Sequence, residues 1–243
     1  MSLEYRQEPS TQTEPETLPE LHIPVPYYTI ILLICMSAVF VAQLIIGVER
    51  SALIAGFAKP AFLYDHEYWR ILTGAAVHGS VPHILMNGYA LYSFGKLMEM
   101  LTNRAHLAIV FLLAAVGGGL LSLAFLPDGI SVGASGGIVG LIGYMVVYAF
   151  RRRQFVSADF RKSLLINIGF ILIFGLVLYQ IVDNYGHIGG LLTGIVYGLI
   201  QIPSDEYENP QTASQITNVA GVAALVIYAI TSVFAIFRLI SVR

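Results

Sequence analysis

Seven long apolar segments dominate the sequence and constrain its fold more than any other feature. Each approaches the roughly 20 residues that a helix needs to cross a bilayer. Only 12% of the 243 residues are charged and 56% are hydrophobic, whereas about a quarter of the residues in a soluble domain are charged. We therefore predict an all-α, multi-pass membrane bundle. The segments cover approximately residues 27–47, 82–101, 105–126, 131–150, 163–181, 185–202 and 217–240.

The segments divide the chain into a core of six helices and a seventh helix behind a polar linker. The first residues are polar and acidic, which is typical of a disordered cytoplasmic tail. The first loop contains apolar runs too short to span a membrane, which indicates interfacial helices with Trp69 as an interface anchor. The predicted parts are the tail (1–26), the core (27–202) with its long outer first loop (48–81), the cytoplasmic linker (203–216), and the seventh helix with the C-terminus (217–243).

Basic residues predict the orientation of the bundle. Arg151, Arg152 and Arg153 directly follow the fourth segment, and clusters of this kind stay on the cytoplasmic side. This places the amino terminus in the cytoplasm and the starts of the fourth and sixth segments toward the outer face. We expect the chain to lie in a bacterial inner membrane.

Charge and cysteine content exclude several classes of function. Thirteen basic and fifteen acidic residues nearly balance, which argues against a nucleic-acid-binding surface. The single cysteine, Cys35, permits neither an intramolecular disulfide nor a cysteine metal site. The partner expected from composition is therefore the lipid bilayer, and no nucleic acid.

A serine opens the fourth segment and a histidine opens the sixth, each among glycines. Glycines remove side chains from a helix face, so two backbones can approach closely. Ser135 and His187 are also predicted at the same outer level, which makes them a plausible nucleophile and base. The alternatives are a serine bonded to its own helix and a histidine satisfied by a neighbouring hydroxyl. The glycines expected to pack around them are Gly133, Gly136, Gly190 and Gly194.

A second polar pair lies in the second segment. His83 and Asn87 are four residues apart, so they share a helix face. Polar groups within a membrane usually face a functional interior. The alternative is a hydrogen-bonding pair that only holds neighbouring helices together.

These motifs together resemble the rhomboid family of intramembrane serine proteases. The resemblance covers roughly residues 48–198, in the order expected for the family. Its pieces are Gly133-Ala134-Ser135-Gly136, His187 with Gly190 and Gly194, His83 with Asn87, and Trp69-Arg70 in the first loop.

The resemblance implies a six-helix rhomboid-like core with a seventh helix, and a Ser135–His187 dyad that needs no acidic third member and no cofactor. It implies that Asn87, helped by His83 and the Ser135 backbone N–H, stabilises the oxyanion. It also implies that Trp69 and Arg70 stabilise the first loop. The implied substrates are transmembrane segments of other proteins, which enter between the second and fifth helices.

Two residues leave alternatives open. Asp183 lies four residues before His187 and either orients it or caps the sixth helix, and we favour the cap. Val139 stands where many active rhomboids have an aromatic residue that packs against the histidine ring. This substitution supports the rival hypothesis of a rhomboid-like protein that binds unstable helices without cutting them.

Two further classes find little support in the sequence. Four histidines (His66, His78, His83 and His187) invite a metal hypothesis, but they lack ligand spacing, so no metal is expected. A transporter would require an inverted repeat or charges deep in the bundle, and neither is visible in the sequence.

Overall fold

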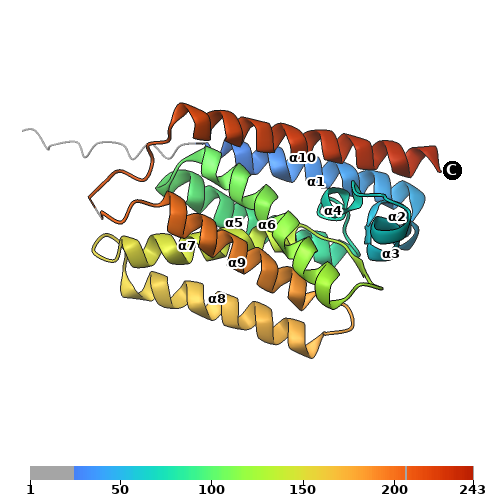
Figure 1. Cartoon of the computed structure of the whole chain (residues 1–243), viewed down its shortest axis with the longest axis horizontal. Helices are drawn as coiled ribbons and strands as arrows, with labels where there is room; N and C mark the ends of the chain where they lie inside the picture. The colour runs from blue at the N-terminus through green and yellow to red at the C-terminus, as the bar shows by residue number, and fades with distance from the viewer. Residues whose placement is uncertain (1–24, 206, 243) are drawn as a thin grey trace, which may run out of the picture.

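The computed structural model describes residues 25–205 and 207–242. The predicted disordered tail lies outside this range apart from its last two residues. In the described part of the chain, seven long helices run side by side, and successive ones are antiparallel (Figure 1). They are α1 (Tyr27–Ile46), α5 (Val81–Leu101), α6 (Arg104–Phe125), α7 (Ser135–Arg151), α8 (Ala158–Val177), α9 (Asn184–Gln201) and α10 (Gln215–Ser241).

Four of these helices, α1, α6, α8 and α10, are long and apolar enough to cross a membrane by length and composition. The chain is therefore an all-α, multi-pass membrane protein. Of the other three, α7 has only 17 residues, while α5 and α9 contain polar and glycine residues. That all seven helices cross the bilayer remains a prediction. The three less apolar helices are those on which the candidate site residues lie.

Two predicted segments begin at the wrong residue. The fourth was expected from residue 131, but Ser131 lies in a short strand and Gly133 has a φ of +117°, outside the helical region. The helix consequently begins at Ser135. The fifth was expected at 163–181, whereas α8 begins at Ala158 because the Ser157 hydroxyl accepts a hydrogen bond from Phe160 N–H at 3.1 Å and caps the helix.

The close packing of α7 against α9 depends on glycine. A Cβ atom added at Gly190 would overlap the carbonyl oxygen of Gly136, and one added at Gly194 would overlap that of Gly140. The two backbones therefore touch along this seam, as the glycine spacing predicted. Most of α7 is buried, so it forms the centre of the bundle, with α6 and α9 packed most closely around it.

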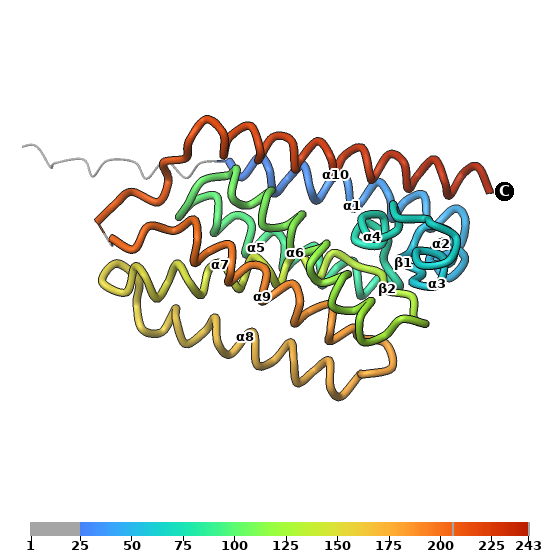
Figure 2. Tube along the Cα trace, viewed as in Figure 1, coloured from blue at the N-terminus to red at the C-terminus, as the bar shows by residue number. Residues whose placement is uncertain are grey.

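The first loop folds into short elements at one end of the bundle (Figure 2). Its strand pairs in antiparallel fashion with the segment that leads into α7, in the register Phe57 with Ser131 and Ala58 with Ile130. This pairing ties the first loop to the approach to Ser135. The short elements are α2 (Val48–Ala55), β1 (Phe57–Ala58), α3 (Lys59–Tyr64), α4 (Arg70–Thr73) and, before α7, β2 (Ile130–Ser131).

Arg70 stabilises the first loop internally, and Trp69 packs the loop against the last helix. The Arg70 guanidinium donates to the carbonyl oxygens of Leu53 at 3.1 Å and Gly56 at 2.9 Å. The Trp69 ring packs edge-on against Phe234 of α10, with ring centres 5.3 Å apart. Trp69 thus contacts another helix of the same chain, a structural role that agrees with the one implied by the resemblance.

Candidate active site

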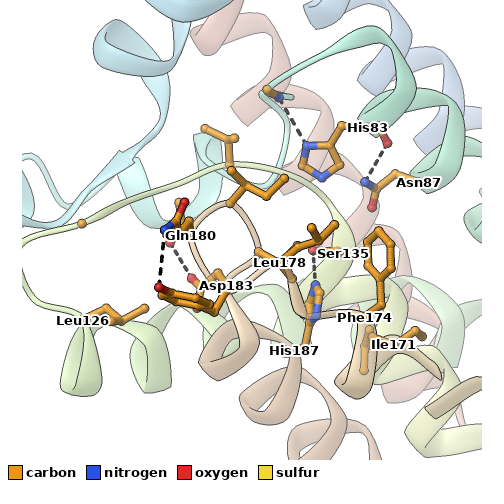
Figure 3. Close-up of a pocket in the computed structure, with 18 of the residues that line it drawn as sticks. His83, Asn87, Leu126, Ser135, Ile171, Phe174, Leu178, Gln180, Asp183 and His187 are labelled. Atoms are coloured by element: carbon orange, nitrogen blue, oxygen red, sulfur yellow. Dashed lines mark hydrogen bonds between the residues drawn. The ribbon is translucent and has the colours of Figure 1, made fainter. Parts of the chain in front are cut away.

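Ser135 and His187 lie at the same end of the bundle and form a hydrogen bond. Ser135 is the first residue of α7 and His187 lies in the first turn of α9. The distance between Ser135 Oγ and His187 Nε2 is 2.9 Å (Figure 3). His187 is largely buried, with 9% of the surface of the residue exposed. The pair predicted from the sequence is therefore brought together in the geometry that a serine nucleophile and its base require.

The start of α7 provides backbone donors beside the serine. The first N–H groups of a helix have no acceptor within the helix and carry the positive end of its dipole. Gly133 N–H donates to Gly74 O at 2.9 Å and holds the preceding turn in place. A side chain at Gly133 would stand 2.7 Å from the His83 ring. Glycine at this position therefore lets His83 approach the turn that presents Ser135.

His83 is held in one tautomer by the loop before α5. Its Nδ1 accepts a hydrogen bond from Gly79 N–H at 3.4 Å, so the ring proton belongs on Nε2. The Nε2 side of the ring faces the turn at Gly133. His83 therefore presents a donor beside the start of α7.

Asn87 lies one turn further along α5, and its Nδ2 donates to the His83 carbonyl oxygen at 3.0 Å. An amide nitrogen carries two protons, so one N–H is left for another acceptor. Figure 3 shows Ser135 with His187 on one side and His83 and Asn87 on the other. All four residues line one cavity.

This cavity has a volume of about 1040 Å³ and lies among α5, α7, α8, α9 and the segment before α7. Its wall on α8 is apolar, with Ile171 and Phe174 (Figure 3). Only 11% of the apolar stretch of α8 is buried within the protein, against 39–44% for α1, α6 and α10. The cavity is thus bounded by the most loosely packed of these helices.

Asp183 caps α9, as the sequence favoured, and its carboxylate makes no hydrogen bond to the His187 ring. Its Oδ1 accepts from Gly186 N–H at 2.9 Å, while its Oδ2 accepts from Ser131 Oγ at 2.5 Å. His187 Nδ1 is buried and has no hydrogen-bond partner among the described residues. The arrangement is therefore a pair of residues rather than a triad.

Val139 is buried one turn after the nucleophile and lines the same cavity as Ser135 and His187. The aliphatic side chain that stands in place of the expected aromatic residue therefore faces the site. Its consequence for the reaction remains a prediction.

His78 is a residue that the sequence analysis missed, having considered it only as a metal ligand. It is fully buried in the loop before α5, and its Nε2 accepts from the N–H of Ala134 at 3.5 Å. Its Nδ1 donates to Ala76 O at 3.2 Å. Its backbone N–H and C=O both bond the Gln43 side chain of α1 at 2.9 Å. The sequence signal that could have indicated this contact is Gln43, a polar residue within an apolar segment.

Burial keeps His78 neutral. The pKa of His78 falls to about 3, chiefly because of burial and to a smaller extent because of the neighbouring His83, while the bond to Ala76 O opposes the shift. A neutral imidazole can accept at one nitrogen while it donates at the other. His78 is therefore suited to holding the backbone just before Ser135.

Comparison with known proteins shows which family the chain resembles. A family model described as "Rhomboid domain" matches residues 65–204. The chain is 32% identical over 154 residues to "RHOMBOID-like protein 6, mitochondrial" of Arabidopsis thaliana, covering 62% of this chain and 50% of that protein. It is 34% identical over 141 residues to "RHOMBOID-like protein 4" of the same plant, covering 58% of this chain and 36% of that protein.

A bacterial protein with a named activity is also similar. The chain is 32% identical over 139 residues to "Rhomboid protease GluP" of Bacillus subtilis, covering 57% of this chain and 27% of that protein. The matches span half or less of the length of each of these relatives. With more than half of its residues matched by the domain model, the chain belongs to the rhomboid family.

Proposed function

We propose that the chain is an intramembrane serine endopeptidase that hydrolyses peptide bonds in or near transmembrane segments of membrane proteins. The observation that carries the proposal is the hydrogen bond between Ser135 Oγ and His187 Nε2. Membership of a family that includes a named protease supports it. The proposal names no cofactor, because a serine and a histidine suffice for acyl transfer.

In the proposed reaction, Ser135 Oγ attacks the carbonyl carbon of the substrate while its proton passes to His187 Nε2. The oxyanion that forms is stabilised by the Ser135 backbone N–H, the second N–H of Asn87 and His83 Nε2–H. When the C–N bond breaks, His187 returns the proton to the leaving amine. Water then attacks the acyl-enzyme while His187 accepts its proton. The ester bond to Ser135 Oγ breaks, the carboxylic acid leaves, and His187 returns the proton to Ser135 Oγ.

The substrate is proposed to enter from the bilayer between α5 and α8. The cavity lies between these helices, and α8 is the least buried of the four most apolar helices. A helical segment cannot be cut while its carbonyls are hydrogen-bonded within the helix. Substrates should therefore carry small or helix-weakening residues near the bond that is cleaved.

The orientation and the membrane are also part of the proposal. Arg151, Arg152 and Arg153 lie at the opposite end of α7 from Ser135, so the positive-inside rule puts the site toward the outer face. The relatives come from a plant and a bacterium, one of them named as mitochondrial. The bacterial inner membrane therefore stays a prediction.

A second candidate function is recognition of unstable transmembrane helices without cleavage. The observation that favours it is Val139, which gives His187 an aliphatic neighbour in the cavity wall where active relatives are expected to have an aromatic ring. An aliphatic contact can hold an imidazole by packing alone. The hydrogen bond between the two candidate catalytic residues favours the protease.

The test is covalent labelling of the detergent-solubilised protein with a fluorophosphonate probe, which reacts only with an activated serine. We expect the wild-type protein to be labelled and both Ser135→Ala and His187→Ala to lose labelling. Two exposed residues provide matched controls, Ser163→Ala and His66→Asn. Asparagine is chosen at His66 because the φ of this residue is +59°.

Cleavage of a transmembrane peptide in reconstituted vesicles completes the test. Wild-type protein that is folded, as judged by a cooperative thermal transition, and yet shows neither labelling nor cleavage would overturn the protease proposal. Binding of the same peptide by that protein would instead support the second candidate.

A further inference from the structure

The Asp183 carboxylate contacts two hydroxyl groups and one ammonium group from three other parts of the chain. Oδ1 caps α9 through Gly186 N–H. Oδ2 accepts hydrogen bonds from Ser131 of β2 at 2.5 Å and from Ser122 of α6. The ammonium of Lys59, at the start of α3 in the first loop, lies 3.9 Å from the same oxygen. One carboxylate therefore joins the first loop, α6, β2 and α9.

Lys59 is an unusual member of this cluster because its side chain is only 1% exposed. Burial lowers the pKa of Lys59, and the Asp183 carboxylate works against this shift by raising it. Among the described residues, the ion pair of Lys59 is the one with Asp183. A buried ammonium needs a counter-charge, so the position of the first loop depends on that of Asp183.

The cluster is linked to both candidate catalytic residues by the same spacing. Ser131 lies four residues before Ser135, and Asp183 lies four residues before His187. The bond between Ser131 and Asp183 therefore cross-links the two segments that lead into the nucleophile and the base. In addition, His187 N–H donates to the Asp183 carbonyl oxygen at 3.1 Å. Displacement of Asp183 would shift the backbone of His187 directly.

We infer that Asp183, held by Ser131 and Lys59, is a positioning residue that sets the alignment of His187 with Ser135. The inference rests on the proposed protease function. Asp183 acts through the backbone and through the neighbouring segments, not through the imidazole, whose Nδ1 has no partner among the described residues. Because Lys59 belongs to the first loop, this loop must be in place for His187 to align with Ser135.

The informative variant is Asp183→Asn. Asparagine caps helices about as well as aspartate, so the cap of α9 is retained while the charge is removed. Lys59 is then left buried without its counter-charge. We expect the maximal rate of fluorophosphonate labelling to fall by about 10- to 100-fold, as for a displaced reacting group. The probe concentration at half-maximal rate should change less than the maximal rate, because Asp183 lines the cavity but bonds neither the Ser135 hydroxyl nor the His187 ring.

A double variant separates the charge from the cap. In Lys59→Met with Asp183→Asn, neither charge is buried, so the cluster is again neutral. We expect this double variant to recover most of the labelling rate that Asp183→Asn loses. Asp159→Asn and Lys162→Met are the matched controls, since both residues are exposed in the first turns of α8. Both controls should label at the wild-type rate.

The outcomes discriminate between the proposals. An unlabelled wild type would contradict the protease function itself, whatever the variants do. If the wild type is labelled and Asp183→Asn labels equally fast, the positioning role is wrong. If Asp183→Asn is slow and the double variant is no faster, the pairing with Lys59 is not what aligns His187. The thermal transition of each variant is measured to test whether the labelled protein is folded.

Discussion

Arg238, near the end of α10, lies 5.0 Å from the centre of the Trp69 ring in the first loop. Arg70 lies over the same ring at 4.7 Å, and Glu67 bridges the two cations at 2.5 Å from Arg70 and 3.5 Å from Arg238. The seventh helix is thus attached to the loop that reaches the candidate site. This gives the helix a structural purpose that its apolar sequence alone does not indicate.

Arg238→Ala should loosen this attachment. Loss of the cation–π contact with Trp69, together with the partly exposed ion pair to Glu67, is expected to cost about 1 kcal/mol, or a fall of about 2–4 °C in Tm. Arg238→Lys should restore little of it, because an ammonium lacks the planar face that stacks on the ring. The measurement is thermal unfolding in detergent, with the exposed Arg153→Ala as control. An unchanged Tm for Arg238→Ala would show that the contact does not hold α10.

Gly190→Ala should reduce labelling far more than Gly169→Ala does. The added methyl group would overlap the Gly136 carbonyl oxygen and push α9 away from α7. Because His187 lies one turn earlier on α9, the dyad distance should increase and labelling should be lost. Gly169→Ala on α8 is the control, since nothing lies within 4 Å of its added Cβ. Alanine there should be neutral or slightly stabilising, and equal labelling by both variants would contradict the glycine-packing argument.

Local patterns in the sequence account for much of this site. The glycine spacing on α9 and the motif around Ser135 are short-range features, and they identified the helix seam and the two residues that meet across it. The hydrophobic runs located the seven long helices of the described residues, because apolar length is a property of each segment alone. The cap at Asp183 was likewise visible from its place before a helical run.

Long-range contacts could not be predicted in the same way. The partners of Asp183 lie 52 and 61 residues away at Ser131 and Ser122, and no periodicity connects such positions. His78 meets Ala134 across 56 residues. The start of α7 was misplaced because Ser131, at the beginning of the apolar run, pairs as a strand with the first loop. This pairing is a tertiary contact, and the helix begins only after it, at Ser135. These features depend on how the loops fold back, which a segment-by-segment analysis does not give.

His78 should make the protein less stable at mild acid pH. Its folded pKa of about 3 lies below its ordinary value of 6.5, so below pH 6.5 the unfolded chain binds a proton that the folded chain excludes. The free energy of unfolding therefore falls as the pH drops from 6.5 toward 3, by about 1–2 kcal/mol between pH 6.5 and 5. Denaturant unfolding at pH 7.5 and pH 5 measures this loss.

His78→Gln provides the comparison for this pH dependence. Glutamine keeps hydrogen-bonding groups in the loop but does not titrate, so the variant should lose less stability than the wild type between the two pH values. The remaining histidines are present in both proteins, and the difference between the two therefore isolates His78. Identical slopes in the two proteins would contradict a neutral, buried His78.

Asn87→Ala should reduce the reaction without unfolding the protein. Removal of one oxyanion donor typically lowers the rate by about 10²- to 10³-fold, and we expect a loss of this size in cleavage of a reconstituted transmembrane peptide. Asn167→Ala on α8 is a matched control, because Asn167 makes the same bond to the carbonyl four residues earlier, to Ser163 O at 2.8 Å, but is exposed. If both variants cleave at the wild-type rate, Asn87 serves only its own helix through the His83 carbonyl. A loss confined to Asn87→Ala, with an unchanged thermal transition, would assign its second N–H to the developing oxyanion.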